Sequence, residues 1–286
     1  MSELTIKSIP TGLFKLDGGA MFGVVPKQLW QRLVPADEKN MCTWSMRCLL
    51  IETPSRKILV DTGIGNKQDE KFRSHFSPHG EDSLIGSLAK YQLTPDDITD
   101  VFLTHLHFDH VGGAVKKAEG DQLVPTFPNA IYHSNKTQWD WALAPNAKEK
   151  ASFLVENFVP LLEAEKINFL ESGDGSSWMP WVDGIEIRTC FGHTMGMMIL
   201  KIPYGKRKVI FGADLMPSSA HIPMPYVMSY DIQPMETLKE KKWLLEECLD
   251  ENHLLFFEHD AKIECASVKQ NNKGRIILGD PELLNI

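Results

Sequence analysis

Residues 104–113 read THLHFDHVGG, which places three histidines and an aspartate within six positions. Buried imidazoles and carboxylates are costly to hold together unless a positive charge pairs with them. His105 and His107 lie two apart, so in an extended loop both side chains can point to one side. Asp109 and His110 follow, and imidazole with carboxylate is the usual ligand set of zinc and related metals. Four such groups exceed what one metal takes from one segment, so the stretch predicts two metal ions.

Three later segments place a further ligand-type residue just beyond an expected strand. They read FGH at 191–193, FGAD at 211–214 and FFEH at 256–259, which contribute His193, Asp214 and His259. Reactive groups of layered α/β proteins collect on loops beyond strand ends, so we expect these residues to complete the two-metal site. A carboxylate such as Asp214 can bridge two ions, because each of its oxygens offers lone pairs.

The composition is that of an ordinary soluble chain. Its 286 residues carry a formal net charge of -8, with 43% hydrophobic and 24% charged residues. Acidic and basic residues are interspersed, so the sequence predicts no nucleic-acid partner and no membrane partner. No apolar run approaches the ~20 residues that cross a bilayer, and the N-terminus lacks a signal-peptide pattern. The five cysteines are scattered, without a CxxC pair, which favours reduced thiols and a cytoplasmic protein.

Short β-rich runs alternate with helical stretches along the chain. Residues 45–52 and 57–60 predict a hairpin, and 99–104 predicts a short buried strand that ends at the histidine cluster. Residues 134–165 look mostly helical, and a further helix is expected at about 235–250. Two β-rich halves, each finished by helices, predict two sheets packed face to face with helices outside.

The stretch 104–113 matches the HxHxDH signature of the metallo-β-lactamase superfamily. The supporting segments DTG (61–63), GHT (192–194), GAD (212–214) and EHD (258–260) appear in that family's order. The chain therefore resembles this superfamily from about residue 40 to about residue 265. The resemblance implies an α/β fold, an αββα four-layer sandwich of two mixed β-sheets flanked by helices. It would form a single domain over residues 1–286, with an N-terminal extension or lid at about 20–40.

Carried over position by position, the resemblance assigns the ligands of a dinuclear centre. The first ion would be bound by His105, His107 and His193 and the second by Asp109, His110 and His259, with Asp214 as the bridge. Asp61 would hold the site in shape, although an aspartate before Thr-Gly can also simply make a turn. The cofactors would be two divalent metal ions per chain, with zinc as the first choice and iron, cobalt or manganese as alternatives.

The implied reaction is hydrolysis of a small-molecule substrate by a hydroxide that bridges the two metals, because bound ions lower the pKa of water toward neutrality. Asp109 and Asp214 are the candidate catalytic residues, since either carboxylate could pass a proton to the leaving group. A lactone or carboxylic ester is the first substrate class, and a phosphotriester or phosphodiester is the alternative on the same site. A metal-containing ligand-binding module without catalysis is the non-enzyme alternative.

The segment VVPKQLW (24–30), followed by PADE (35–38), looks most like the branch that contains N-acyl homoserine lactonases and methyl parathion hydrolase. This likeness implies a homodimer. Trp30 and Leu33 look exposed, as residues of a dimer contact or of a lid would be.

The surroundings of the site depart from the lactonase pattern at one position. Pro217 stands where the lactonases often carry a tyrosine, and this bears on the substrate rather than on the metals. His221, Met224 and Tyr226 follow closely enough to be possible substrate contacts. His221 could equally be an ordinary loop histidine.

Overall fold

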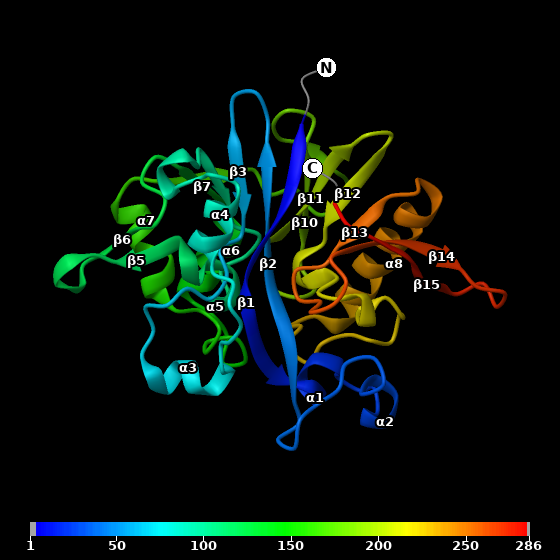
Figure 1. The fold of residues 1–286 in the computed structure, drawn as a ribbon. Helices are drawn as coiled ribbons and strands as arrows, with labels where there is room; N and C mark the ends of the chain where they lie inside the picture. Colours follow the sequence, from blue (N-terminus) through cyan, green and yellow to red (C-terminus); the bar gives the residue numbers. More distant parts are fainter. Residues whose placement is uncertain (1–3, 285–286) are drawn as a thin grey trace. The chain divides into compact units, whose positions relative to one another are not determined.

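The computed structural model describes residues 4–284, which divide into two compact units. The first unit comprises residues 4–12 and 46–172, and the second comprises 13–45 and 173–284. Strands β1 (Thr5–Asp17) and β2 (Met41–Glu52) contribute residues to both units. Figure 1 traces the chain through its helices and strands.

The first unit contains the main part of a six-stranded mixed sheet, in the order β1-β2-β3-β4-β7-β8. Strand β3 (Lys57–Val60) pairs antiparallel with β2, with Leu49 opposite Val60, which confirms the predicted hairpin. β4 (Asp100–Phe102), β7 (Ile131–Asn135) and β8 (Ile167–Leu170) continue the sheet in parallel. The remaining elements are α3 (Glu70–Phe76), α4 (Leu84–Lys90), η1 (Pro95–Asp97), α5 (Phe108–Val111), η2 (Gly112–Ala114), β5 (Val115–Lys117), η3 (Glu119–Asp121), β6 (Leu123–Pro125), α6 (Lys136–Leu143), η4 (Val155–Asn157) and α7 (Val159–Glu163).

The expectation that residues 134–165 are mostly helical is wrong for the stretch between α6 and η4, which is irregular. Pro145 lacks the N–H that a helix interior requires. The Asn146 side chain then accepts hydrogen bonds from the backbone N–H groups of Lys148 and Glu149, which favours a turn over a helix. The aromatic rings on either side, Trp139 and Phe158, pack in the core as ordinary buried residues.

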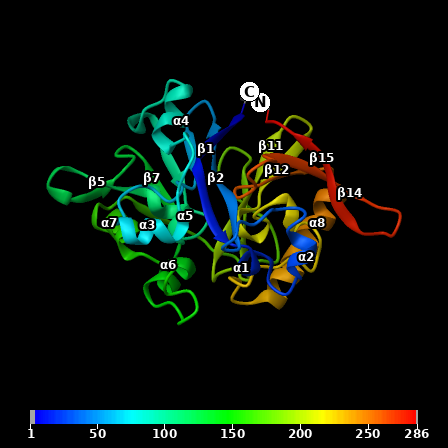
Figure 2. The ribbon, with the colours of Figure 1, turned by 60° about the horizontal axis from the view of Figure 1, so that its bottom comes forward.

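The second unit contains a seven-stranded mixed sheet in the order β15-β14-β13-β12-β11-β10-β9. The strands are β9 (Met179–Pro180), β10 (Glu186–Cys190), β11 (Met197–Tyr204), β12 (Arg207–Phe211), β13 (Leu254–Phe256), β14 (Cys265–Gln270) and β15 (Ile276–Glu282). Among the described strands of this sheet, β12 and β13 pair in parallel, and the other neighbours pair antiparallel. Figure 2 shows the β14–β15 hairpin extending from the end of the sheet.

The predicted helix at 235–250 is confirmed as α8 (Pro234–Asp250), which begins with proline in its first turn. Leu244, Leu245 and Cys248 lie on its buried face, at the i, i+1, i+4 spacing of an amphipathic helix. The short turns η5 (Ala213–Leu215) and η6 (Ser219–His221) follow β12. Helix α8 packs against η5, the turn that carries Asp214.

The segment before β2 forms two short helices, α1 (Gly18–Phe22) and α2 (Lys27–Trp30). Trp30 is buried, so the expectation that it is exposed is wrong. Its ring stacks on Phe22 at a centroid distance of 5.2 Å, and it lies against Gly18, where a side chain would have no room. Leu33 is exposed as expected, at 48% of its accessible surface.

Two mixed sheets with accompanying helices confirm the predicted α/β fold class. Within residues 4–284, none of the helices combines the length and the apolar character needed to cross a bilayer.

Candidate metal centre

In the second unit, strand register brings Asp214 and His259 together. Phe211 and Phe256 are partners in the parallel pair β12–β13, so both strands end at one edge of the sheet. Asp214 lies three residues beyond Phe211, and His259 lies three residues beyond Phe256. The His259 Nε2 atom is 3.1 Å from the Asp214 Oδ1 atom as a result.

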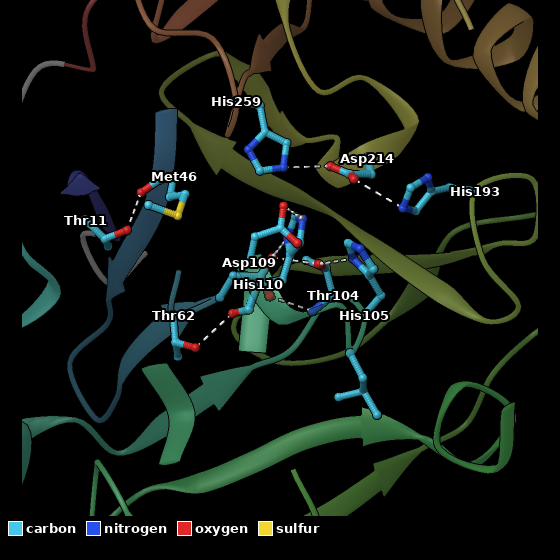
Figure 3. A network of polar contacts seen from close by, with 12 residues as sticks. Thr11, Met46, Thr62, Thr104, His105, Asp109, His110, His193, Asp214 and His259 are labelled. Carbon is cyan, nitrogen blue, oxygen red and sulfur yellow. Dashed lines mark hydrogen bonds and ion pairs between the residues drawn. The ribbon is translucent and has the colours of Figure 1, made fainter. Parts of the chain in front are cut away.

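His193 reaches the same carboxylate from the loop between β10 and β11. Because β11 pairs antiparallel with both neighbours, this loop lies at the edge where β12 ends. The His193 Nε2 atom is 3.2 Å from the Asp214 Oδ2 atom. Figure 3 shows the Asp214 carboxylate between the two imidazoles, with one oxygen directed to each. A carboxylate in this position is suited to bridge two cations.

Each of these histidines is held by a second polar group. His193 donates from Nδ1 to the Asp231 carboxylate over 2.8 Å, and Asp231 is buried. His259 donates from Nδ1 to the backbone oxygen of Ser45, also over 2.8 Å. Such partners fix the ring orientation and place the proton on Nδ1, which leaves Nε2 as the nitrogen that can bind a metal.

Helix α8 supports the backbone just before His193. The Glu240 carboxylate accepts hydrogen bonds from the N–H groups of Phe191 and Gly192, over 2.6 and 3.1 Å. Burial raises the pKa of Glu240 to about 7, although these two bonds act in the opposite direction. Gly192 packs directly on the helix, since a Cβ there would lie 2.5 Å from the Thr237 backbone nitrogen.

In the first unit, strand register places Asp61 beside the histidine stretch. Val60 and Phe102 are partners in the parallel pair β3–β4, and Asp61 directly follows Val60. The buried Asp61 carboxylate accepts from the N–H and the Oγ1 of Thr104, over 2.8 and 2.6 Å. It also accepts from the Nδ1 of His110, over 3.0 Å. Asp61 has a φ of 58°, a left-handed conformation that aspartate tolerates better than most residues.

The three other ligand-type residues of this stretch are also buried and close together. The Thr104 Oγ1 atom, which donates to Asp61, lies 3.1 Å from the Nδ1 of His105 and can accept a hydrogen bond from it. His107 packs on the Phe153 ring, and its Nε2 lies 3.5 Å from the carboxylate of Glu149, which is 3% exposed. Asp109 Oδ2 is 3.9 Å from His110 Nε2 on the short helix α5.

The donor set fits divalent metal ions. Five buried imidazoles and two buried carboxylates are present, and a polar group contacts one ring nitrogen of every imidazole. This is the arrangement of metal-ligating histidines, which coordinate through one nitrogen and hydrogen-bond through the other. Nε2 is then the ligand atom of His105, His110, His193 and His259.

The possible substrate contacts lie on the segment after η5. His221 is 1% exposed, and its ring nitrogens contact the Ser218 Oγ at 2.7 Å and the Met21 backbone oxygen at 2.9 Å. Burial lowers the pKa of His221 to about 4. Both nitrogens therefore serve to tie this segment to the N-terminal region, which favours the interpretation as a structural histidine.

Met224 and Tyr226 are half-buried, and a lysine fixes their backbone. The buried Lys241 of α8 donates from Nζ to the backbone oxygens of Pro223, Met224 and Tyr226, over 2.8, 3.3 and 2.9 Å. Burial lowers the pKa of Lys241 to about 7. Lys241 thus determines the course of the chain that carries both possible contacts.

Several of these supporting residues lie outside the recognised motifs. Asp231, Glu240 and Lys241 follow the site by many positions, and Glu149 lies on the irregular stretch after α6. Nothing in their local sequence sets them apart from solvated acids and bases. Thr104 is different, because it directly precedes His105 and could have been recognised with the motif.

Comparisons with known proteins agree with this geometry. The family model described as the metallo-beta-lactamase superfamily matches residues 47–259, a range that includes every predicted ligand. The N-acyl homoserine lactonase of Bacillus thuringiensis is 25% identical over 277 residues, which cover 91% of this chain and 96% of the relative.

Solved structures are similar over nearly the whole chain. A probable metal-dependent hydrolase from Staphylococcus aureus has a TM-score of 0.84 and 31% identity, with 99% of each chain covered. The dizinc quorum-quenching lactonase AidC, solved with the product N-hexanoyl-L-homoserine, has a TM-score of 0.76 and 23% identity, over 100% of this chain and 97% of AidC. The likeness to AidC concerns the fold alone.

Proposed function

Because the chain belongs to the metallo-β-lactamase superfamily and is a metal-dependent hydrolase, we propose that it is a dinuclear enzyme that cleaves a lactone or a carboxylic ester. The proposed ligands are the seven predicted residues, namely His105, His107, Asp109, His110, His193, Asp214 and His259. Zinc is the first choice of metal, since imidazole and carboxylate suit it and AidC is described as a dizinc enzyme.

The observation that carries the proposal is the position of Asp214 between two anchored histidines. Its two oxygens lie 3.1 and 3.2 Å from the Nε2 atoms of His259 and His193. Two imidazoles and a carboxylate would not be gathered this closely in a buried place for stability alone, because burying them is costly. A closed structural site uses four ligands on one metal, whereas seven ligands for two metals leave positions open for substrate and water.

Bound divalent ions would supply an activated water and polarise the substrate oxygen. The chain's own residues orient this chemistry. Asp61, Asp231 and the Ser45 carbonyl keep Nδ1 of their histidines protonated, so that Nε2 presents a lone pair. Asp109 and Asp214, each 7% exposed, are the carboxylates that would carry a proton to the leaving group.

The substrate class rests on the relatives named as lactonases. An N-acyl homoserine lactone is a small cyclic ester, and these relatives are 25% identical over most of the chain. Pro217 stands where the lactonases often carry a tyrosine, so simple esters belong to the proposed class as well.

We further propose a cytoplasmic homodimer. The five cysteines are all buried, and none of them forms a disulfide within the described residues, which agrees with a reducing compartment. Val24, Leu29 and Leu33 expose apolar side chains close together in the sequence of the N-terminal segment, as a contact between copies would need.

The test is a hydrolysis panel of lactones, aryl esters, phosphotriesters and phosphodiesters, with the wild-type chain and Asp214→Ala. Cleavage of lactones or esters is expected, and Asp214→Ala should lose both bound metal and activity. Faster cleavage of phosphotriesters or phosphodiesters would replace the proposed substrate class. Hydrolysis that persists in Asp214→Ala without metal would contradict the proposed mechanism.

A further inference from the structure

The second unit contains a cavity of about 570 Å³ that includes none of the predicted ligands. It is bounded by the segment after α2, the start of β2, the segments 218–223 and 260–263, and strand β15. Its lining includes Arg32, Trp44, Ala261, Lys262, Ile277 and Leu278. Its volume lies within the range of about 300–1,000 Å³ that small-molecule sites occupy.

The walls of this cavity are mainly apolar. Trp44 of β2 and Ile277 and Leu278 of β15 contribute apolar side chains to the lining. Two hydroxyl groups of the lining already bond within the protein, that of Ser218 with His221 over 2.7 Å and that of Ser219 with Asp260. Such walls favour an aliphatic ligand over a sugar or a nucleobase, which would need free hydrogen-bonding partners.

Two cationic side chains, Arg32 and Lys262, also line the cavity. Both are exposed, and neither is paired with an acidic group within residues 4–284. The single acid of the lining is Asp260. Its Oδ2 accepts from the N–H and hydroxyl of Ser219, and its Oδ1 accepts from the backbone N–H groups of Lys262 and Ile263.

The lining therefore carries a net charge of +1 beside its apolar side chains, since it has two cations and one carboxylate. Both oxygens of that carboxylate already accept hydrogen bonds from backbone N–H groups and a hydroxyl. An uncharged apolar ligand would leave both cations unused. A polyphosphate would need many more donors than these walls present.

We propose that this cavity binds an aliphatic carboxylate, with its chain against Trp44, Ile277 and Leu278 and its head near Arg32 and Lys262. The site uses no metal and no predicted catalytic residue. It is therefore a second binding site, which goes beyond the proposed hydrolysis and does not depend on it.

The experiment is calorimetric titration of the metal-loaded protein with octanoate, decanoate and decyltrimethylammonium. We expect one decanoate per chain in the cavity, bound about fourfold more tightly for each methylene added from octanoate. The cation of similar chain length should bind more weakly than decanoate. Ala261→Trp, which places a large ring on the cavity wall, should abolish this site. A matched substitution on the exposed surface of the first unit, Ala118→Trp, should leave it unchanged.

A second variant tests whether the two exposed cations bind the carboxylate head group of the ligand. The double variant Arg32→Gln/Lys262→Gln should weaken decanoate binding by roughly tenfold, since two exposed ion pairs contribute about 0.2–1 kcal/mol each. Lys39→Gln/Lys273→Gln removes the same charge from exposed positions outside the lining and should bind normally. Unchanged decanoate binding in both cavity variants would place the carboxylate at the metals only and overturn the proposal, as would preference for the cation.

Discussion

The two units supply the predicted ligands in different ways. The first unit gives four of them from one contiguous stretch, His105 to His110, whose anchor Asp61 is fixed by the register of two neighbouring parallel strands. The second unit gives three from three separate segments, and their supports Ser45, Asp231 and Glu240 come from other segments again. A compact motif needs few long-range contacts, whereas the dispersed set depends on the correct packing of α8 and of β2.

The largest effects on metal affinity are expected when the carboxylates that hold the histidines of the two units, Asp61 and Asp231, are replaced. Asp61→Asn replaces an acceptor of three hydrogen bonds, and Asp231→Asn replaces the acceptor for His193. Each should weaken metal affinity about 10–100-fold. Asp61→Asn should also lower the free energy of unfolding by about 1–3 kcal/mol, because buried donors lose their charged partner. Metal titration and denaturant unfolding measure the two effects, and equal stability of both variants would remove the distinction between the units.

The packing of α8 is tested next. In Gly192→Ala the new Cβ would lie 2.5 and 2.6 Å from the backbone N and Cα of Thr237, so the helix must shift. We expect a loss of about 1–3 kcal/mol in the free energy of unfolding, together with weaker metal binding.

Two variants serve as controls for this substitution. Gly173→Ala in the same unit meets only the flexible side chain of Met179 and should be nearly neutral. Thr237→Ala added to Gly192→Ala removes the hydroxyl oxygen that would lie 2.4 Å from the new Cβ, but it should restore stability only in part, because the other two close atoms belong to the backbone. Full rescue would show that the helix is not fixed as described.

Each unit also contains a buried lysine that donates to backbone oxygens. Lys67 donates to Gly112 in the first unit, and Lys241 donates to three carbonyls in the second. Burial lowers the pKa of each lysine to about 7. Between pH 7 and about 10.5 the unfolded chain holds the proton of Lys241 and the folded chain releases it. This residue therefore makes the free energy of unfolding rise with pH over that window.

Lys241→Met should remove the contribution of this residue to the rise and leave that of Lys67. It should also cost about 1–3 kcal/mol, because three carbonyls lose a donor. Denaturant unfolding at pH 7 and pH 9.5 measures both effects. The exposed neighbour variant Lys242→Met should follow the wild-type curve. An equal loss of stability in Lys241→Met at both pH values would contradict the lowered pKa of Lys241. It would still agree with the loss of three hydrogen bonds.

The smallest effect is expected at His221. Its folded pKa of about 4 lies below the ordinary value of 6.5, so the unfolded chain binds the proton first as the pH falls. The associated stability is fully present above pH 6.5 and is lost toward pH 4. Asp214, His259 and Lys241 are the charged or titratable groups that influence this ring.

His221→Phe keeps a ring against Phe22 but loses both hydrogen bonds. It should be less stable by about 1 kcal/mol at pH 7 and should show a flatter pH dependence between 4 and 6.5. Unfolding curves across that range decide this, with the exposed His75→Asn as the control. A large loss of activity at unchanged stability would instead favour a substrate contact.

The sequence predicted the fold class, the hairpin at 45–60 and the helix α8, because alternation, periodicity and proline at a helix start are local signals. It also placed every ligand-type residue beyond a strand, since parallel strands deliver their ends to one edge. It did not predict that Trp30 is buried, because that follows from a contact with Phe22 across a turn. The sequence also did not predict the roles of Asp231, Glu149 and Lys241, because a buried charged residue cannot be told from a solvated one until its contacts are known.

We propose that the chain holds two metal ions through two sets of ligands. The test is elemental analysis of protein purified without chelator, on the wild-type chain and on Asp214→Ala. We expect two divalent ions per chain for the wild type and a loss of metal from the variant. One ion or none in the wild type, or an unchanged content in Asp214→Ala, would contradict it.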